Sequence, residues 1–440
     1  MSTLSRLRPL RALSTPIAAA TLALAAQAQT LGPTLNLSNS AASSEWGQAA
    51  VVGSNVYTVW TDKSANQRHL ARFARSPDGG VSFGSPVTVL VAGTAGGGPH
   101  VAADGAYVYV ARNARPKANK PAQVYFRASA NQGTSFGPEI ALTAPAIAPN
   151  GAGLEAIAAA GSNVHVLWGT SVGAGSRVFV SSSSNGGATF AAAVEISGAM
   201  GGGNGVMRAL GTNVHVAWVR EVAGAEEVFH SRSTNGGATF SPPANLSASA
   251  GQNSVMPQLA LAGANVYLAY REDPEFRLIR STDGGASFGA PVNVSGFEDN
   301  DGLAGGPRLA ASGSVLHVIW KDDTAAPGPD YEVFHRSSPD GGASFGAVTN
   351  LGPIAPTEFG LVAAEGLNAY VVWNEASGGV RIRQSVDGGA IFTPALSVSA
   401  FGGAAFVAAA QSPTPAGVHV GWHDTTPGNN ELFYRFGSTP

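Results

Sequence analysis

The chain contains no cysteine, which excludes disulfide bonds, a lipid anchor on cysteine and thiolate ligands for metal ions. Charged residues are also scarce. They make up 12% of the 440 residues, against about 25% in an average globular protein, and the formal net charge is -3. Because a nucleic-acid-binding domain needs a basic face, we expect no nucleic-acid partner.

Long apolar runs are missing as well. The most apolar stretch, residues 17–26, is well short of the roughly 20 residues that a membrane-spanning helix needs. Arg6, Arg8 and Arg11 precede this stretch, and Ala26-Gln27-Ala28 follows it with the small residues of a cleavage site. The pattern predicts a signal peptide over residues 1–28 and a secreted or periplasmic protein without a membrane span.

One short pattern recurs seven times in the remaining chain. Each copy reads Ser, any residue, Asp or Asn, any residue, Gly, any residue, usually Ser or Thr, then Phe. The copies begin at Ser76, Ser129, Ser183, Ser233, Ser281, Ser338 and Ser385. Their spacing of 47 to 57 residues is typical of the four-stranded blades of a β-propeller.

Each repeat contains short runs of strand-forming residues between turn-forming ones. In the fifth repeat we expect strands near residues 258–261, 266–270, 277–280 and 290–294, with the repeated pattern between the third and fourth. No long helical periodicity competes with this interpretation after residue 28. The sequence therefore predicts an all-β fold of four-stranded antiparallel blades.

The second strand of each repeat gives a count of blades. These strands end at Trp60, Ala111, Trp168, Trp218, Tyr270, Trp320, Trp373 and Trp422. The last unit has three strands, whereas Asn36-Leu37-Ser38 near the start matches the fourth strands at Asn245-Leu246-Ser247 and Asn293-Val294-Ser295. We predict one monomeric domain over residues 29–440, an eight-bladed propeller whose last blade is completed by an N-terminal strand. Seven blades are the alternative.

The repeated pattern resembles the Asp box of the BNR-repeat, sialidase-like β-propellers, with Phe in place of the usual Trp. The resemblance covers the chain after residue 28 and implies a β-propeller whose boxes are structural and lie away from any active site. The central box residues are Asp78, Asn131, Asn185, Asn235, Asp283, Asp340 and Asp387. We expect each Phe to pack back into its own blade. In the seventh box Ile391 replaces the second hydroxyl residue, so one hydrogen bond must be missing there.

The antiparallel strand order places the boxes at one end of the ring and the longer loops at the other. Function normally lies on such loops. At this loop face, Gln48, His100, Gln258 and Arg308 begin first strands, Arg112 and Arg271 lie near the ends of second strands, and Trp46 could stack on a sugar ring. The alternative interpretation is that the first-strand residues form hydrogen bonds between blades, and that acidic residues at the ends of second strands accept backbone N–H groups.

The resemblance also implies what a sialidase would require: three arginines that grip a carboxylate, a tyrosine nucleophile with a glutamate, and an acid. Glu45-Trp46-Gly47-Gln48, where the family's first arginine is expected, contains no arginine. We find no catalytic constellation. The sequence therefore favours an exported module that binds a glycan or a protein through the loop face, with a sialidase-like exo-glycoside hydrolase as the alternative.

One short segment suggests a cation. Glu298, Asp299 and Asp301 place carboxylates next to a glycine, and Ca²⁺ prefers such oxygen ligands. The segment lacks the twelve-residue spacing of a calcium-binding loop, so it is a weak candidate, and no other cofactor is expected. His165, His215, His317 and His419 recur at one position of the second strands, which predicts packing between blades rather than a zinc site.

Overall fold

The computed structural model describes residues 30–438 apart from 64–68, 92, 94–95, 145–146, 173–174, 199–200, 250, 273, 297–305, 324–330, 356–359, 376–378, 400–410, 414–415 and 426. The expected signal peptide and the cation candidates Glu298, Asp299 and Asp301 lie outside the described residues. The described residues form 33 strands, and none of them belongs to a helix that could cross a membrane.

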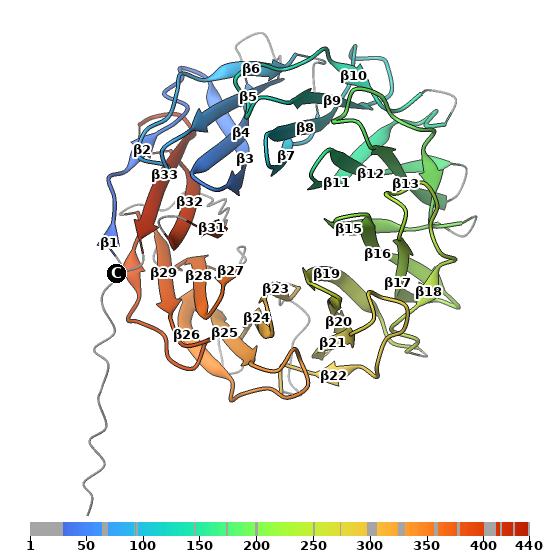
Figure 1. The fold of residues 1–440 in the computed structure, drawn as a ribbon, viewed down its shortest axis with the longest axis vertical. Coiled ribbons are helices and arrows are strands. Elements are labelled where there is room, and N and C mark those ends of the chain that lie inside the picture. The colour runs from blue at the N-terminus through green and yellow to red at the C-terminus, as the bar shows by residue number, and fades with distance from the viewer. Residues whose placement is uncertain are drawn as a thin grey trace, which may run out of the picture.

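Eight antiparallel sheets stand around a common centre (Figure 1). Blade 1 contains β3 (Ser43–Val52), β4 (Asn55–Lys63), β5 (His69–Ser76) and β6 (Val87–Leu90). Blade 2 contains β7 (His100–Asp104), β8 (Tyr107–Ala114), β9 (Gln123–Ser129) and β10 (Ile140–Ala141). Blade 3 contains β11 (Ala152–Ala160), β12 (Asn163–Val172), β13 (Gly175–Ser183) and β14 (Val194–Glu195). Blade 4 contains β15 (Gly203–Leu210), β16 (Asn213–Val222), β17 (Ala225–Ser233) and β18 (Ala244–Asn245).

The second half of the chain continues the series. Blade 5 contains β19 (Ser254–Ala262), β20 (Asn265–Glu272), β21 (Glu275–Ser281) and β22 (Val292–Asn293). Blade 6 contains β23 (Arg308–Ser312), β24 (Val315–Asp322), β25 (Tyr331–Ser338) and β26 (Thr349–Ile354). Blade 7 contains β27 (Leu361–Glu365), β28 (Asn368–Asn374), β29 (Val380–Ser385) and β30 (Leu396–Ser397). Blade 8 contains β31 (Gln411–Pro413), β32 (Ala416–Asp424), β33 (Glu431–Ser438) and the N-terminal strands β1 (Thr30–Leu31) and β2 (Leu35–Asn36).

The predicted ring closure is confirmed, with eight blades rather than seven. Both N-terminal strands pair with β33: Thr30 lies opposite Ser438, and Leu35 lies opposite Tyr434. The innermost strands contact one another in sequence around the ring, and β3 of blade 1 contacts β31 of blade 8. This arrangement is the propeller that the resemblance to Asp-box proteins implies.

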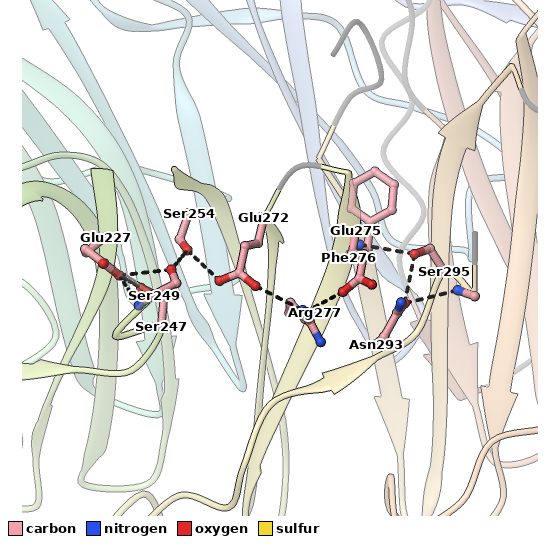
Figure 2. Close-up of polar contacts among 11 residues, drawn as sticks. Glu227, Ser247, Ser249, Ser254, Glu272, Glu275, Phe276, Arg277, Asn293 and Ser295 are labelled. Atoms are coloured by element: carbon pink, nitrogen blue, oxygen red, sulfur yellow. Dashed lines mark hydrogen bonds and ion pairs between the residues drawn. The ribbon is translucent and has the colours of Figure 1, made fainter. Parts of the chain in front are cut away.

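A repeated serine explains why Asn36-Leu37-Ser38 can complete blade 8. In six blades a Ser or Thr hydroxyl just after the fourth strand accepts a hydrogen bond of 2.9–3.2 Å from a backbone N–H of the third strand; these residues are Ser38, Thr143, Ser197, Ser247, Ser295 and Ser399. Figure 2 shows this contact between Phe276 and Ser295. Ser38 binds Leu432 of β33 in the same way, although 394 residues separate them.

Each of the seven boxes is a hydrogen-bonded turn. In each box the first serine donates a hydrogen bond to the Asp or Asn side chain at 2.6–2.9 Å and accepts one from the N–H of the glycine four residues later at 2.7–3.0 Å. The expectation that each box Phe packs into its own blade is wrong for five boxes, whose Phe ring contacts an aromatic ring of the preceding blade. In the sixth box Arg336 of the same blade lies over the Phe345 ring. Phe136 lies 4.9 Å from Phe73 and Phe83 lies 4.8 Å from Tyr434, each in the preceding blade. The boxes therefore join neighbouring blades.

The missing hydroxyl of the seventh box gives a stability prediction. In the other six boxes the second Ser or Thr is bonded to the Asp or Asn side chain at 2.5–2.9 Å, but Ile391 offers only its backbone N–H to Asp387 and is 70% exposed. We expect Ile391→Thr to raise the free energy of unfolding by about 0.5–1 kcal/mol, because one hydrogen bond is gained and little apolar burial is lost. Urea unfolding measures the change; Thr239→Ile should destabilise the protein by a similar amount.

The strand register corrects one of the residues that the sequence analysis placed at the end of a second strand. Val56 pairs with the box residue Ser76 and Trp60 follows four residues later, whereas in blade 2 Val108 pairs with Ser129. The position of Trp60 is therefore occupied in blade 2 by Arg112 and not by Ala111. The aromatic residues at this position are buried between blades, and so is Arg112.

Candidate functional site

The strand register defines the two faces of the ring. The start of each first strand lies beside the end of the second, as in the pair Ser254 and Glu272, whereas the boxes follow the third strands at the opposite end. We call the former end the loop face. The loop from Ala114 to Gln123, between β8 and β9, belongs to it.

Four inner strands carry a β-bulge near the loop face. The register shifts at Trp46, Glu155, Asn204 and Met256 in blades 1, 3, 4 and 5. Three of these residues, all except Glu155, have φ angles of 55° to 56°, which non-glycine residues adopt rarely. Bulges re-aim side chains and are common beside active sites. The side chains at these four positions are therefore the first to consider as functional.

Two of the bulged residues line a cavity of about 450 Å³ on the loop face of blade 3. The residues around it come from blades 2, 3 and 4, and include Arg115, Asn150, Glu155, Thr170, Ser171, Ser176 and Asn204. Most of the remaining lining is glycine and alanine, so backbone groups form much of the wall. Such a wall offers many hydrogen-bonding groups, and more of its surface is polar than apolar.

Glu155 is the acidic group of this cavity. One carboxylate oxygen, Oε2, accepts a 2.7 Å hydrogen bond from the backbone N–H of Gly205 in the next blade. A Cβ atom on Gly169 would lie 2.5 Å from Oε1, and one on Gly205 would overlap Oε2, so two glycines leave the space that the carboxylate fills. Burial raises the pKa of Glu155, and the Gly205 N–H opposes that rise only in part. A carboxyl group in this state can accept hydrogen bonds or exchange a proton.

The other polar groups of the wall are held by the backbone. The side chain of Asn150 donates to the Ser171 carbonyl at 3.0 Å, and the Thr170 hydroxyl donates to the Gly151 carbonyl at 2.7 Å. Among the described lining residues, no second carboxylate and no tyrosine accompany Glu155. The pair of acidic groups that most glycosidases use is therefore not assembled in the described part of this cavity.

The predicted first-strand residues Gln48, His100, Gln258 and Arg308 occupy equivalent register positions in their blades. Gln48 borders a small void together with Gly421 and Tyr434 of blade 8. Burial lowers the pKa of His100 to about 4. Gln258 pairs with Ala269 within its own sheet and is half-buried.

Trp46 is the predicted ligand residue whose position fits best. Its side chain is 43% exposed, its Cβ packs against Gly98, and the Lys63 ammonium lies 5.1 Å from the ring centroid. Gly96, two residues from Gly98, forms a β-bridge with Ala114. Trp46 and the Arg115 end of the cavity therefore flank the same short glycine segment.

The predicted arginines come from blades that are not all neighbours. Arg112 is fully buried between blades 1 and 2, where Nη1 donates to the His69 carbonyl at 2.6 Å, and burial lowers its pKa to about 10. Arg271 belongs to β20 of blade 5 and Arg308 to β23 of blade 6, where Arg308 Nη1 donates to the Pro307 carbonyl at 3.1 Å. A cluster of all three around one carboxylate is not formed.

Acidic residues at the ends of second strands have partners other than the expected backbone groups. The Asp62 carboxylate accepts a 2.7 Å hydrogen bond from the Ser44 hydroxyl and forms a 3.2 Å ion pair with Nε of Arg72. Glu272 binds Ser254 and Arg277 at 3.2 and 3.0 Å in the equivalent arrangement of blade 5 (Figure 2). These carboxylates fasten strands within a blade.

Figure 2 shows how this contact continues into blade 4. The Ser254 hydroxyl lies 2.9 Å from that of Ser249, which also reaches the buried Glu227, and Arg277 pairs with Glu275 at 2.5 Å. Every carboxylate in the figure has a described partner, so we assign the network a structural role.

Histidines and acids do not gather into a metal site in the described part of the chain, where no group of three or more is placed to hold an ion. Instead, histidines pair within a blade. Nδ1 of His215 lies 3.2 Å from Nε2 of His230, and Nδ1 of His317 lies 3.0 Å from Nε2 of His335. All four are buried; packing was predicted for His215 and His317, whereas His230 and His335 lie on third strands and were not singled out by the sequence pattern.

Comparison with known proteins gives similarity in fold. No protein-family model and no curated protein matches the chain. Among solved structures, the chain is similar to polysaccharide lyase Uly1 (10% identity, TM-score 0.49, 78% of this chain and 90% of that one) and to an ulvan lyase of another structure (10%, 0.48, 82% and 95%). It is also similar to the NanB sialidase from Streptococcus pneumoniae, with 9% identity and a TM-score of 0.43; the match covers 87% of this chain and 83% of that one.

Proposed function

We propose that this protein binds a glycan in the loop-face cavity around Glu155. The observation that carries the proposal is the placement of that carboxylate, which Gly205 holds and for which Gly169 leaves space. The cavity volume of about 450 Å³ falls within the range of about 300–1,000 Å³ typical of small-ligand sites. Backbone groups, hydroxyls and amides around one carboxylate suit the hydroxyls of sugars, and the exposed Trp46 supplies a stacking surface nearby.

A glycan fits this face better than a protein partner does. The site is concave and its described lining is mostly small and polar. Protein interfaces instead have a core enriched in aromatic residues, methionine and arginine. A folded protein partner would therefore find few anchors there.

Glu155→Gln tests the proposal directly. The amide keeps the shape of the side chain but removes the negative charge that accepts sugar hydroxyls, so we expect a 10- to 100-fold loss of affinity, as for a hydrogen bond to a charged group worth about 1.5–3 kcal/mol. Isothermal titration with the best ligand from a glycan array measures the loss.

Glu226→Gln is the matched control, because Glu226 is exposed on β17 and is not among the residues that line the cavity. The Glu226→Gln variant should bind the same glycan with the affinity of the unchanged protein. Array binding that is absent, or that Glu155→Gln leaves unaltered while the variant stays folded, would contradict a glycan site at Glu155.

Glycan cleavage is the second candidate, and the raised pKa of Glu155 favours it because a general acid must hold its proton near the working pH. The hypothesis of a sialidase-like hydrolase predicts turnover of a fluorogenic sialoside or glycoside that Glu155→Gln abolishes. Binding without turnover supports the binding module.

We also propose that the protein is exported as a monomer after cleavage near Ala28. The sequence pattern of residues 1–28 supports export. Pairing of β1 and β2 with β33 leaves only two short strands at the outer edge of blade 8, and short edges offer a second copy little to join. Intact mass and light scattering of the secreted protein check both points.

A further inference from the structure

Three cations stand at the edge of the cavity. Arg115, Lys117 and Lys120 fall within six residues of the loop between β8 and β9, although charged residues make up only 12% of the chain. All three side chains are exposed, and Arg115 lines the cavity. The loop is therefore a local concentration of positive charge in a weakly charged protein.

The loop is fixed at both ends. On one side Ala114, next to Arg115, forms the β-bridge with Gly96. On the other side the Ala122 carbonyl accepts a 2.8 Å hydrogen bond from the N–H of Ala152 in blade 3, and Ala122 also lines the cavity. Between these ends, the Lys120 N–H donates to the Lys117 carbonyl at 3.0 Å. Arg115 and Ala122, near the two ends of the loop, line the cavity, and Lys117 and Lys120 lie between them in the chain.

The positive charge of the loop has no ion-pair partner among the residues that the structure describes. None of Arg115, Lys117 and Lys120 forms an ion pair with a described residue, whereas Lys63, Arg72, Arg177, Arg277 and Arg381 all do. The acid of the lining, Glu155, is held on the opposite side by Gly205 of blade 4. Unpaired cations beside a polar cavity attract anions and raise their local concentration.

We infer that the glycan bound at this site is an anionic polysaccharide, whose acidic groups pair with Arg115, Lys117 and Lys120 while sugar hydroxyls of the same chain reach Glu155 and the backbone of the cavity. This inference rests on the proposed glycan-binding function. The acidic group is a carboxylate or a sulfate ester, because both accept hydrogen bonds from guanidinium and ammonium groups.

The experiment compares four probes of matched length by isothermal titration. These are a hexagalacturonate, a sulfated carrageenan hexasaccharide, the neutral cellohexaose and a hexanucleotide of DNA. We expect at least one anionic sugar to bind at least about tenfold more tightly than cellohexaose, with an advantage that shrinks as salt rises from 50 to 500 mM because exposed charges are screened. The preferred anionic sugar identifies carboxylate or sulfate as the recognised group.

Two variants test the loop itself. Lys117→Gln with Lys120→Gln should lose most of that tenfold preference and leave cellohexaose binding unchanged, because neither lysine is among the residues that line the cavity. The variant with Arg115→Lys, Lys117→Arg and Lys120→Arg conserves the charge and should retain most of the preference for the anionic sugar. Both variants change exposed side chains, and equal thermal unfolding confirms that they fold.

The outcomes separate this inference from the proposed function. Tighter or equal binding of cellohexaose, sensitive to Glu155→Gln, would overturn the anionic ligand and keep the glycan site. DNA binding as tight as that of the acidic sugars would show attraction of any polyanion and would also overturn it. Failure of every sugar to bind would overturn both proposals.

Discussion

Deletion of residues 30–38 is expected to destroy the cooperative folding of this protein. The deletion removes both strands that pair with β33 and the Leu37 side chain buried between blades 8 and 1. Loss of the buried leucine alone costs about 1.5–3 kcal/mol, and the open edge of β33 loses its hydrogen bonds as well. We expect destabilisation of at least about 5 kcal/mol, close to the whole stability of many domains, seen as aggregation or loss of the thermal transition.

A circular permutant is the control for that deletion. Residues 30–38 would be joined after Ser438 through a short flexible linker, so that β2 reaches β33 from the other end of the chain. A chain that begins at Gln29 is the second control. Both should melt near the temperature of the secreted protein. If the deleted chain melts as they do, the N-terminal strands are not needed to close the ring.

Acid is expected to unfold the protein steeply between pH 6.5 and pH 4.5. Burial lowers the pKa of six histidines to about 4 and that of two more to about 3; these are His100, His165, His215, His317, His419 and His423, and His230 and His335. The unfolded chain takes up protons below about pH 6.5, whereas the folded chain does not, so stability is lost as the pH falls.

The size of this effect follows from the same linkage. At pH 5 each such histidine costs about 2 kcal/mol relative to neutral pH, and eight of them, even at half that value, cost about 8 kcal/mol. Burial raises the pKa of Asp62 and Glu155, so these groups offset a part of the loss. The box aspartates, whose pKa hydrogen bonding lowers, contribute only below about pH 4. We expect the melting temperature to fall by at least about 10 °C from pH 7 to pH 5.

Blade 4 provides a variant for this prediction. His215 and His230 stack at 5.5 Å, and the equivalent residues of blade 1 are Tyr57 and Phe73, stacked at 6.2 Å under the same box turn. His215→Tyr with His230→Phe should flatten the dependence of melting temperature on pH by about a quarter. Tyr57→Phe, which removes no histidine, should shift the curve equally at every pH. An unchanged slope in the double variant would show that these histidines do not control acid unfolding.

Much of the architecture could be predicted from residues that repeat. Seven boxes gave the blade length, and the match of Asn36-Leu37-Ser38 to later fourth strands identified the closure. The position of Arg112 could not be found in this way, because a charged residue there breaks the aromatic pattern and moves the apparent end of the strand by one residue. The contacts of the box phenylalanines lie between blades and leave no signal within one repeat.

The candidate site was less accessible to sequence reasoning, because it does not repeat. Glu155 lies between Leu154 and Ala156 without any motif around it, and a bulge that shifts the register places it in the cavity. Its pocket depends on Gly169 and Gly205, from another strand and another blade. One signal was present in the sequence, the cluster of Arg115, Lys117 and Lys120 in a long loop of a weakly charged chain.

The pairing of Thr30 with Ser438 has a consequence for how the molecule can be oriented on a support. β1 lies at the outside of the ring beside β33 (Figure 1), and Thr30 and Ser438 pair at the end of β33 from which boxes follow in other blades. A tether fused to Thr30 or to Ser438 would therefore leave from the face of the ring that carries the boxes, opposite the loop face. If the protein is immobilised by such a tether, the loop face with the Glu155 cavity would point away from the support and into solution.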